Sequence, residues 1–238
     1  MIRLSAIAGR ELASYFRSSI GWIVLSLFLL LSGLWIAFST LRPGEPATLR
    51  TFFGVSQWLL LIVAPAISMK LVAEERRAGT LEPLMTAPVS DWTIVIGKYL
   101  GALGFLLCML APTLLYVGLL EAVSDPDYGP IAAGYLALVL VGGLYLSFGL
   151  LASALTESQV VALLATFFFF VLWEVLATEG ARLLGPPLDQ PLFALSILLR
   201  IADMAKGVID TAHVVFFVCA SIFFLTLATV AVESRRWR

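Results

Sequence analysis

Six stretches of this chain are long enough to cross a lipid bilayer and carry almost no charge. A helix needs about 20 apolar residues to cross the hydrocarbon core. The stretches lack the alternation of a membrane β-barrel, so they are predicted to be helices. The predicted spans cover residues 20–41, 51–70, 93–120, 131–153, 158–178 and 211–232. The sequence therefore predicts an all-α integral membrane protein with six transmembrane helices, in a single domain over residues 1–238.

Composition excludes most other classes of protein. Of the 238 residues, 61% are apolar and 13% are charged, whereas soluble domains have about 45–50% and about 25%. This excludes a soluble enzyme and a disordered chain, and a net charge of −1 gives no electrostatic attraction to nucleic acid. One histidine and two cysteines are too few for a metal cluster or a disulfide framework. We expect no metal site, no catalytic residues and no nucleic-acid partner.

The positively charged residues predict how the spans are oriented. If the N-terminus is cytoplasmic, ten of the fifteen lysines and arginines flank the inner ends of the spans and five lie outside. Because cytoplasmic flanks are enriched in these residues, both termini are predicted to be cytoplasmic. The first apolar run is too long for a signal peptide and no cleavage site follows it, so we expect it to be retained.

Residues 2–18 predict an amphipathic helix before the first span. Arg3, Arg10 and Arg17 are seven residues apart and share one face, and the opposite face is apolar. A helix of this kind lies along the membrane interface. Two compatible interpretations stay open. The arginines can be a positively charged signal that sets the membrane topology, and the segment can be an elbow helix that packs on a partner.

The segment from residue 71 to residue 92 predicts a short cytosolic helix between the second and third spans. Gly79 suits the end of one helix, and Thr80 can cap the next, with Glu82 in its first turn. The apolar residues of this helix are Leu81, Leu84 and Met85. An apolar edge among charged residues suggests a docking surface, and the alternative is a solvated turn.

Several groups of residues in and around this segment form a pattern. They are Ser68-Met69-Lys70-Leu71, Glu74-Glu75-Arg76 with Gly79-Thr80-Leu81-Glu82, and Pro88-Val89-Ser90. Further groups are Arg10-Glu11-Leu12 near the N-terminus, Ser153, Thr156 and Gln159 in the second inner turn, and Gly207-Val208-Ile209-Asp210 before the last span. In this order and spacing they resemble the ABC-2 type transporter permeases, in particular the branch associated with gliding motility and copper-enzyme maturation.

The resemblance implies a half-transporter. Two copies of this chain, or this chain and a related permease, would line an export pathway in a bacterial-type plasma (inner) membrane, in contact with its lipids. Two separate ATPase subunits would dock below and bind ATP and Mg, so no cofactor is expected in this chain. An extracytoplasmic accessory protein is a further candidate partner.

The resemblance also implies which residues contact the ATPase. The coupling residues would be Glu74, Glu75, Arg76, Gly79, Thr80, Leu81, Glu82, Leu84 and Met85. The second inner turn would contribute Ser153, Thr156, Glu157 and Gln159. The arginines of the elbow helix would lie beside them.

The chain shows no phosphate loop of its own. That loop needs the pattern G-x-x-x-x-G-K-[ST], and the only Gly-Lys pair, Gly97-Lys98, has Trp92 at the first glycine position and Tyr99 after the lysine. We interpret Lys98 as a lysine that snorkels to water from the inner end of the third span. ATP hydrolysis is therefore expected in a partner.

The outer segment, residues 179–210, contains an apolar run too short to span the membrane. It predicts short re-entrant helices, with a surface-lying connector as the alternative. Glu174 is the one carboxylate inside a span, 17 residues past Glu157, or about 25 Å at 1.5 Å per residue. It is therefore predicted near the outer interface, where water reaches it, and a role toward substrate or protons stays open. A possible outer gate comprises Glu174, Leu195, Leu198 and Leu199.

A few residues inside the spans predict how the helices pack. Cys108 and Cys219 fall mid-span and are predicted to be buried. Gly101 and Gly104 predict a close helix contact within the subunit, with a dimer interface as the alternative. Pro65 and Pro112 are predicted to kink the second and the third span.

Three functions are compatible with a membrane protein of this kind. The favoured one is the membrane subunit of an ATP-driven transporter, and the alternative is a scaffold or force-transmitting subunit that moves no solute. A membrane enzyme is disfavoured because the spans hold no pair of carboxylates and no second histidine for acid-base chemistry. The uniformly apolar spans favour a hydrophobic, amphipathic or bulky cargo over a small ion.

Overall fold

The computed structural model describes residues 2–39, 48–77, 79, 90–124, 126–186 and 189–234. These residues form helices, with no strand among them, and six helical segments are long and apolar enough to cross a membrane. The six segments are Ser19–Ser39, Arg50–Arg77, Asp91–Val123, Tyr128–Leu155, Gln159–Leu184 and Thr211–Glu233. The predicted class, an all-α protein with six spans, is confirmed.

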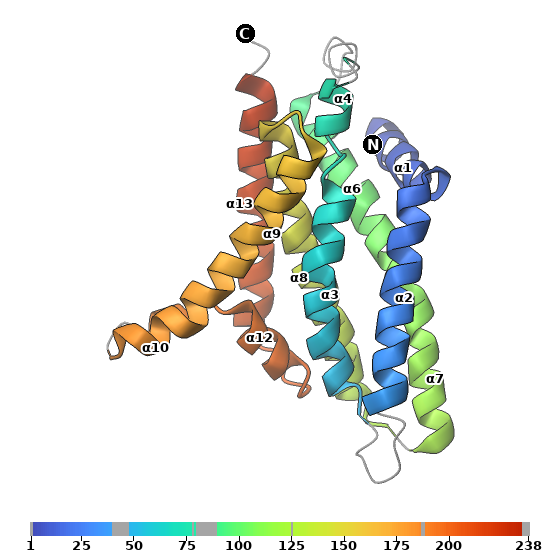
Figure 1. The fold of residues 1–238 in the computed structure, drawn as a ribbon, viewed down its shortest axis with the longest axis vertical. Helices are drawn as coiled ribbons and strands as arrows, with labels where there is room; N and C mark the ends of the chain where they lie inside the picture. The colour runs from blue at the N-terminus through green and yellow to red at the C-terminus, as the bar shows by residue number, and fades with distance from the viewer. Residues whose placement is uncertain are drawn as a thin grey trace.

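The bundle is built around α8 (Tyr128–Leu155), whose apolar stretch is 78% buried. It packs against α3 (Arg50–Ser68), α6 (Asp91–Leu110), α9 (Gln159–Val175) and α13 (Thr211–Glu233). Figure 1 shows these helices running side by side along the long axis of the molecule. Glycines of α8 allow the close approach: a Cβ at Gly142 would lie 2.4 Å from the Leu106 side chain, which is too short for carbon atoms.

The N-terminal helix α1 (Ile2–Arg17) is held on the inner part of α6. A Cβ on Gly97 would lie 2.7 Å from Ile7, and one on Gly101 would lie 2.6 Å from Glu11 and 2.9 Å from the Ala8 carbonyl oxygen. These glycines therefore let the two backbones touch. The intrasubunit interpretation of Gly101 is confirmed.

The third span is broken where the sequence places a proline. α6 is capped by the Ser90 side chain, ends at Leu110, and is followed by a 3₁₀ turn, Ala111–Thr113, and then by α7 (Leu114–Val123). Proline removes one backbone donor and disfavours the continuous α-helix. The predicted kink at Pro112 is thus a change of helix type between two segments of one span.

The outer segment forms a series of short helices. α9 continues through a π-helical turn, Leu176–Gly180, into α10 (Ala181–Leu184), and then follow α11 (Asp189–Phe193) and α12 (Ile197–Met204). In Figure 1, α10 points away from the bundle whereas α12 lies against it, in contact with α8 and α3. The short helices were expected, and their entry into a bilayer remains a prediction.

One packing prediction is wrong. Cys108 and Cys219 are both exposed on the chain. Only a third of the apolar stretch of each of their spans is buried, because each helix turns one face to the bundle. A mid-span position on the opposite face therefore points outward, whatever its depth.

Candidate functional site

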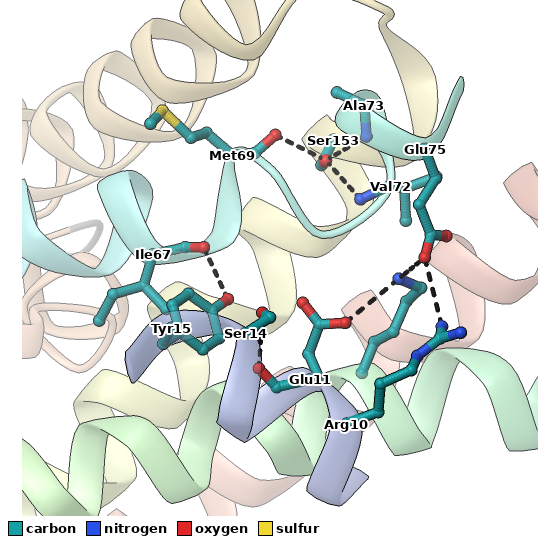
Figure 2. Close-up of polar contacts among 11 residues, drawn as sticks. Arg10, Glu11, Ser14, Tyr15, Ile67, Met69, Val72, Ala73, Glu75 and Ser153 are labelled. Carbon is teal, nitrogen blue, oxygen red and sulfur yellow. Dashed lines mark hydrogen bonds and ion pairs between the residues drawn. The ribbon is translucent and has the colours of Figure 1, made fainter. Parts of the chain in front are cut away.

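Four charged residues form an ion-pair cluster where α1, α4 (Ala73–Arg77) and α6 meet. Lys98 Nζ lies 2.8 Å from Glu75 Oε1 and 3.5 Å from Glu11 Oε2. Arg10 Nη2 lies 3.5 Å from the same Glu75 oxygen. Figure 2 shows the side chains converging from three elements that are far apart in sequence. The cluster therefore joins the N-terminal helix to the C-terminal end of the second span and to the N-terminal part of the third.

Lys98 does not snorkel to water as predicted, since its side chain is 1% exposed. The reason is the pair Gly97 and Gly101, which brings α1 down over the lysine and closes its path to the surface. A buried cation is costly unless it is paired and hydrogen-bonded. The two carboxylates provide that pairing.

Tyr15 ties α1 to the end of α3. Its hydroxyl donates a hydrogen bond to the Ile67 carbonyl oxygen at 2.8 Å, and Lys70 Nζ lies 4.2 Å above its ring, within range of a cation–π interaction. Burial raises the pKa of Tyr15 well above its ordinary value, and the charges of Glu11 and Glu74 raise it further. The hydroxyl therefore stays protonated and remains a donor.

Ser153, at the inner end of α8, supports the turn between α3 and α4. Its Oγ accepts hydrogen bonds from the backbone N–H groups of Val72 at 3.1 Å and Ala73 at 2.9 Å, and donates to the Met69 carbonyl oxygen at 2.9 Å. One hydroxyl thus satisfies three backbone groups that the turn leaves without helical partners, as Figure 2 shows. The second inner turn therefore holds the start of α4 in place.

A second contact joins α4 to the same turn. Arg76 Nη2 lies 2.6 Å from Glu157 Oε1, and its Nη1 donates to the Ala154 carbonyl oxygen at 3.3 Å. Thr156 Oγ1 accepts from the Ser158 N–H at 3.2 Å. Arg76 of the assigned coupling segment and Glu157 of the second inner turn are therefore neighbours in space. Their role toward an ATPase stays a prediction.

A cavity of about 450 Å³ opens beside the ion-pair cluster. Its charged lining is balanced, with three cationic and three anionic side chains: Arg10, Lys70, Lys98, Glu11, Glu74 and Glu75. Gln159 also lines it. Because the charges balance, the cavity favours neither cations nor anions. The charged residues are therefore better placed to hold the helices together than to bind an ion.

Glu174 is buried, 9% exposed, and not open to water as predicted. Its carboxylate accepts hydrogen bonds from Ser196 Oγ at 2.5 Å and from the N–H groups of Ile197 at 3.0 Å and Leu198 at 3.4 Å. The cause is α12, which packs on α8 and α3 and places its N-terminus on the carboxylate. Helix N-termini stabilise negative charge, so Glu174 anchors α12.

Some predicted residues are not brought into either group. The side chains of Leu195 and Leu199 are exposed. Leu198 is half-buried and joins the Glu174 group through its backbone N–H. Arg17 is exposed, while Gly79 ends α4 with φ of 67°. Predicted contacts outside the described residues are those of Thr80, Leu81, Glu82, Leu84 and Met85, and of the Arg3 side chain.

The roles of Glu11, Lys98 and Tyr15 are not among those predicted from the sequence. The signal was present, since Glu11 lies on the apolar face of α1, seven residues after Leu4 and four before Tyr15. Lys98 lies seven residues inside its helix. Two opposite charges in apolar positions predict a buried pair.

Among the described residues, no group of three or more His, Cys, Asp and Glu side chains is placed to hold a metal ion.

The fold and this site define a polytopic membrane protein with six helical spans and a charged junction at one end. The sequence model of the "ABC-2 family transporter protein" matches residues 5–230. The chain belongs to this family, whose members are permease subunits and not themselves enzymes. It is a multi-pass membrane protein.

Two curated relatives carry the name "Probable multidrug ABC transporter permease YbhR", one from Escherichia coli (strain K12) and one from Escherichia coli O157:H7. Each is 36% identical to this chain over 100 residues, which cover 42% of this chain and 27% of the relative. The match thus spans about a quarter of the relatives' length. Neither comparison shows the gliding-motility and copper-maturation branch, so that resemblance stays a prediction.

Proposed function

We propose that this chain is the permease subunit of an ABC-2 exporter that works as a dimer, with two ATPase subunits docked at the end of the bundle that carries α1 and α4. The observation that carries the proposal is the ion-pair cluster. It connects α4, which leads directly into the predicted coupling helix, to both α1 and α6. A displacement of α4 by a partner would therefore move three elements together.

The proposed orientation places this end of the bundle in the cytoplasm of a cell with a bacterial-type inner membrane. α1, α4 and the last turn of α13 lie at the same end of the molecule in Figure 1, which supports two termini on one side. The lysine and arginine distribution supports the cytoplasmic side. ATP and Mg would be bound by the ATPase subunits and not by this chain.

For the cargo, we propose hydrophobic or amphipathic molecules. The relatives' name describes a multidrug permease. The described spans contain two carboxylates outside their end turns: Glu174, which is occupied in anchoring α12, and Glu179, which is exposed and paired with Arg182. The second candidate function is the scaffold that moves no solute. It is favoured only by the resemblance to the gliding-motility branch.

Purification of the tagged chain from its native membranes, followed by mass spectrometry, tests the partners. A co-purifying protein with a phosphate-loop motif in a one-to-one ratio supports the transporter. Recovery of this chain alone, or with structural partners only, favours the scaffold.

A second experiment tests the coupling. The double variant Glu82→Lys with Leu84→Asp is expected to abolish the permease-dependent part of the ATPase activity and the efflux of a hydrophobic dye. Glu121→Lys, on the exposed end of α7, is the matched charge control and is expected to keep both. Equal activities in the two variants would contradict the assigned coupling segment.

A further inference from the structure

The cavity of about 450 Å³ beside the ion-pair cluster opens where α1 meets the first span. α1 ends at Arg17 and α2 (Ser19–Ser39) follows directly after Ser18. Ser14, Ser18 and Ile20 line the cavity from this junction. An amphipathic helix that leads into a span lies at the membrane interface, which is the depth of phospholipid headgroups. The volume lies in the range of small-molecule sites, about 300–1,000 Å³.

One buried cation in the lining has donors to spare. Four of the six charged side chains are used in the ion pairs of the cluster, and Lys70 and Glu74 remain. Lys70 is 9% exposed. Its ammonium lies over one face of the Tyr15 ring and forms no hydrogen bond or ion pair with any described residue. An ammonium carries three donors, and a buried charge without acceptors is costly. Lys70 can therefore donate to a ligand in the cavity that it lines.

Glu74 supplies the opposite charge. It is exposed and lines the same cavity, and its carboxylate forms no ion pair or hydrogen bond with a described residue. Lys70 and Glu74 attract each other through space, but no contact joins them. A single ion satisfies one of the two groups and is repelled by the other. A ligand that carries a phosphate beside an ammonium satisfies both.

An apolar stripe leads away from the cavity along α2. Four exposed side chains form it, Ile20, Ile23, Leu27 and Leu31. Their spacing of three or four residues places them on one face of the helix, and Ile20 also lines the cavity. Trp22 is exposed in the first turn of α2, as is typical of indole rings at a membrane interface. A lipid whose headgroup enters the cavity can therefore lay its acyl chains along α2.

We infer that this cavity binds a phosphate ester of ethanolamine, with its phosphate on Lys70 and its primary ammonium on Glu74. A quaternary ammonium has no N–H to donate to the carboxylate, and a glycerol headgroup has no positive charge. A bilayer phospholipid and a soluble ester both carry this group, and the stripe on α2 favours the phospholipid. The inference goes beyond the proposed function, because binding to the purified chain requires neither an ATPase nor transport.

The test measures binding of three dioleoyl phospholipids to the purified, delipidated full chain in detergent, by native mass spectrometry. Phosphatidylethanolamine is expected to bind about tenfold more tightly than phosphatidylcholine, which lacks the N–H donors, and than phosphatidylglycerol, which lacks the cation. Because the acyl chains are identical, a difference in affinity comes from the headgroup. Equal affinities for the three lipids would overturn the inference.

Glu74→Met is the decisive variant, because Glu74 is exposed and contributes no ion pair to the cluster. The substitution removes the charge and both acceptor oxygens. The preference for phosphatidylethanolamine over phosphatidylcholine is therefore expected to disappear. Glu121→Met, on the exposed end of α7, is the matched control and is expected to keep the preference. A preference that survives in Glu74→Met refutes the assignment of the ammonium.

Lys70→Met tests the phosphate contact. All three lipids carry the phosphate, so the affinity for each is expected to fall about tenfold, whereas the exposed control Lys206→Met is expected to keep the wild-type affinities. Unfolding in SDS checks that the variant is folded. If it is not, the headgroup series and Glu74→Met still decide. Wild-type affinity in a folded Lys70→Met contradicts the site.

Glycerophosphoethanolamine separates the two sources of the ligand, because it has the same headgroup without acyl chains. If a large molar excess leaves phosphatidylethanolamine bound, the result supports the bilayer lipid. Displacement supports a soluble ester.

Discussion

Removal of the buried lysine gives the sharpest test of the ion-pair cluster. At an effective dielectric constant of 20, a pair of unit charges at the 2.8 Å Lys98–Glu75 distance attracts by about 6 kcal/mol, and the cost of burial offsets much of this attraction. In Lys98→Met, Glu75 keeps its ion pair with Arg10. Glu11 loses its partner, because Lys98 is the only cation paired with Glu11 among the described residues. Loss of one partner from a buried pair costs about 3–5 kcal/mol. We expect about 3 kcal/mol, since the Glu11 side chain is 10% exposed and keeps some water.

The measurement is the free energy of unfolding by SDS in mixed micelles, followed by the loss of helical circular dichroism. A double-mutant cycle isolates the pair: Glu11→Gln with Lys98→Met is expected to be more stable than Lys98→Met alone, because no buried charge is left unpaired. Lys98→Arg keeps the charge and is the matched control for its loss. If Lys98→Met unfolds at the wild-type SDS concentration, the burial of this charge and the argument built on it are wrong.

Three other substitutions have expected outcomes. Gly101→Ala places a methyl group against the backbone of α1 and is expected to cost about 2 kcal/mol, measured by the same SDS unfolding, whereas Gly104→Ala has room, at 3.7 Å from the nearest atom, and should be neutral. Glu174→Gln weakens the anchor of α12, so hydrogen exchange of the Leu198 amide is expected to accelerate at least about tenfold; unchanged exchange would argue against the anchor. Ser153→Ala leaves backbone groups of the α3–α4 turn unsatisfied at a cost of about 2 kcal/mol, and Ser153→Thr, which keeps the hydroxyl, should recover part of it.

The spans could be predicted because the bilayer imposes one physical requirement on them. A helix that crosses hydrocarbon must be apolar over its whole length, and that requirement is local in sequence. The break at Pro112 was equally local, since a missing backbone donor acts within one turn. The family pattern was also legible, because its residues lie in order along the chain.

The ion-pair cluster could not be derived in the same way. Lys98 and Glu11 are 87 residues apart, and their contact depends on two glycines that let α1 approach α6. Without that approach, the lysine would have a free path to water, as predicted. The burial of Glu174 has the same origin, because it depends on how α12 packs. The position of a residue along its helix can be predicted from the sequence. Whether another helix packs over its side chain cannot.

The position of Lys98 in the chain has a consequence for biosynthesis. A lysine near the centre of a span opposes membrane insertion by about 2.5–3.5 kcal/mol, and one close to the end of the span by less. Translation starts at the N-terminus, so Glu11 and Glu75 are synthesised before Lys98. Both carboxylates can therefore be at the membrane surface when the third span leaves the ribosome. The lysine can therefore be neutralised as it enters, and the order of synthesis matches the order in which the junction must assemble.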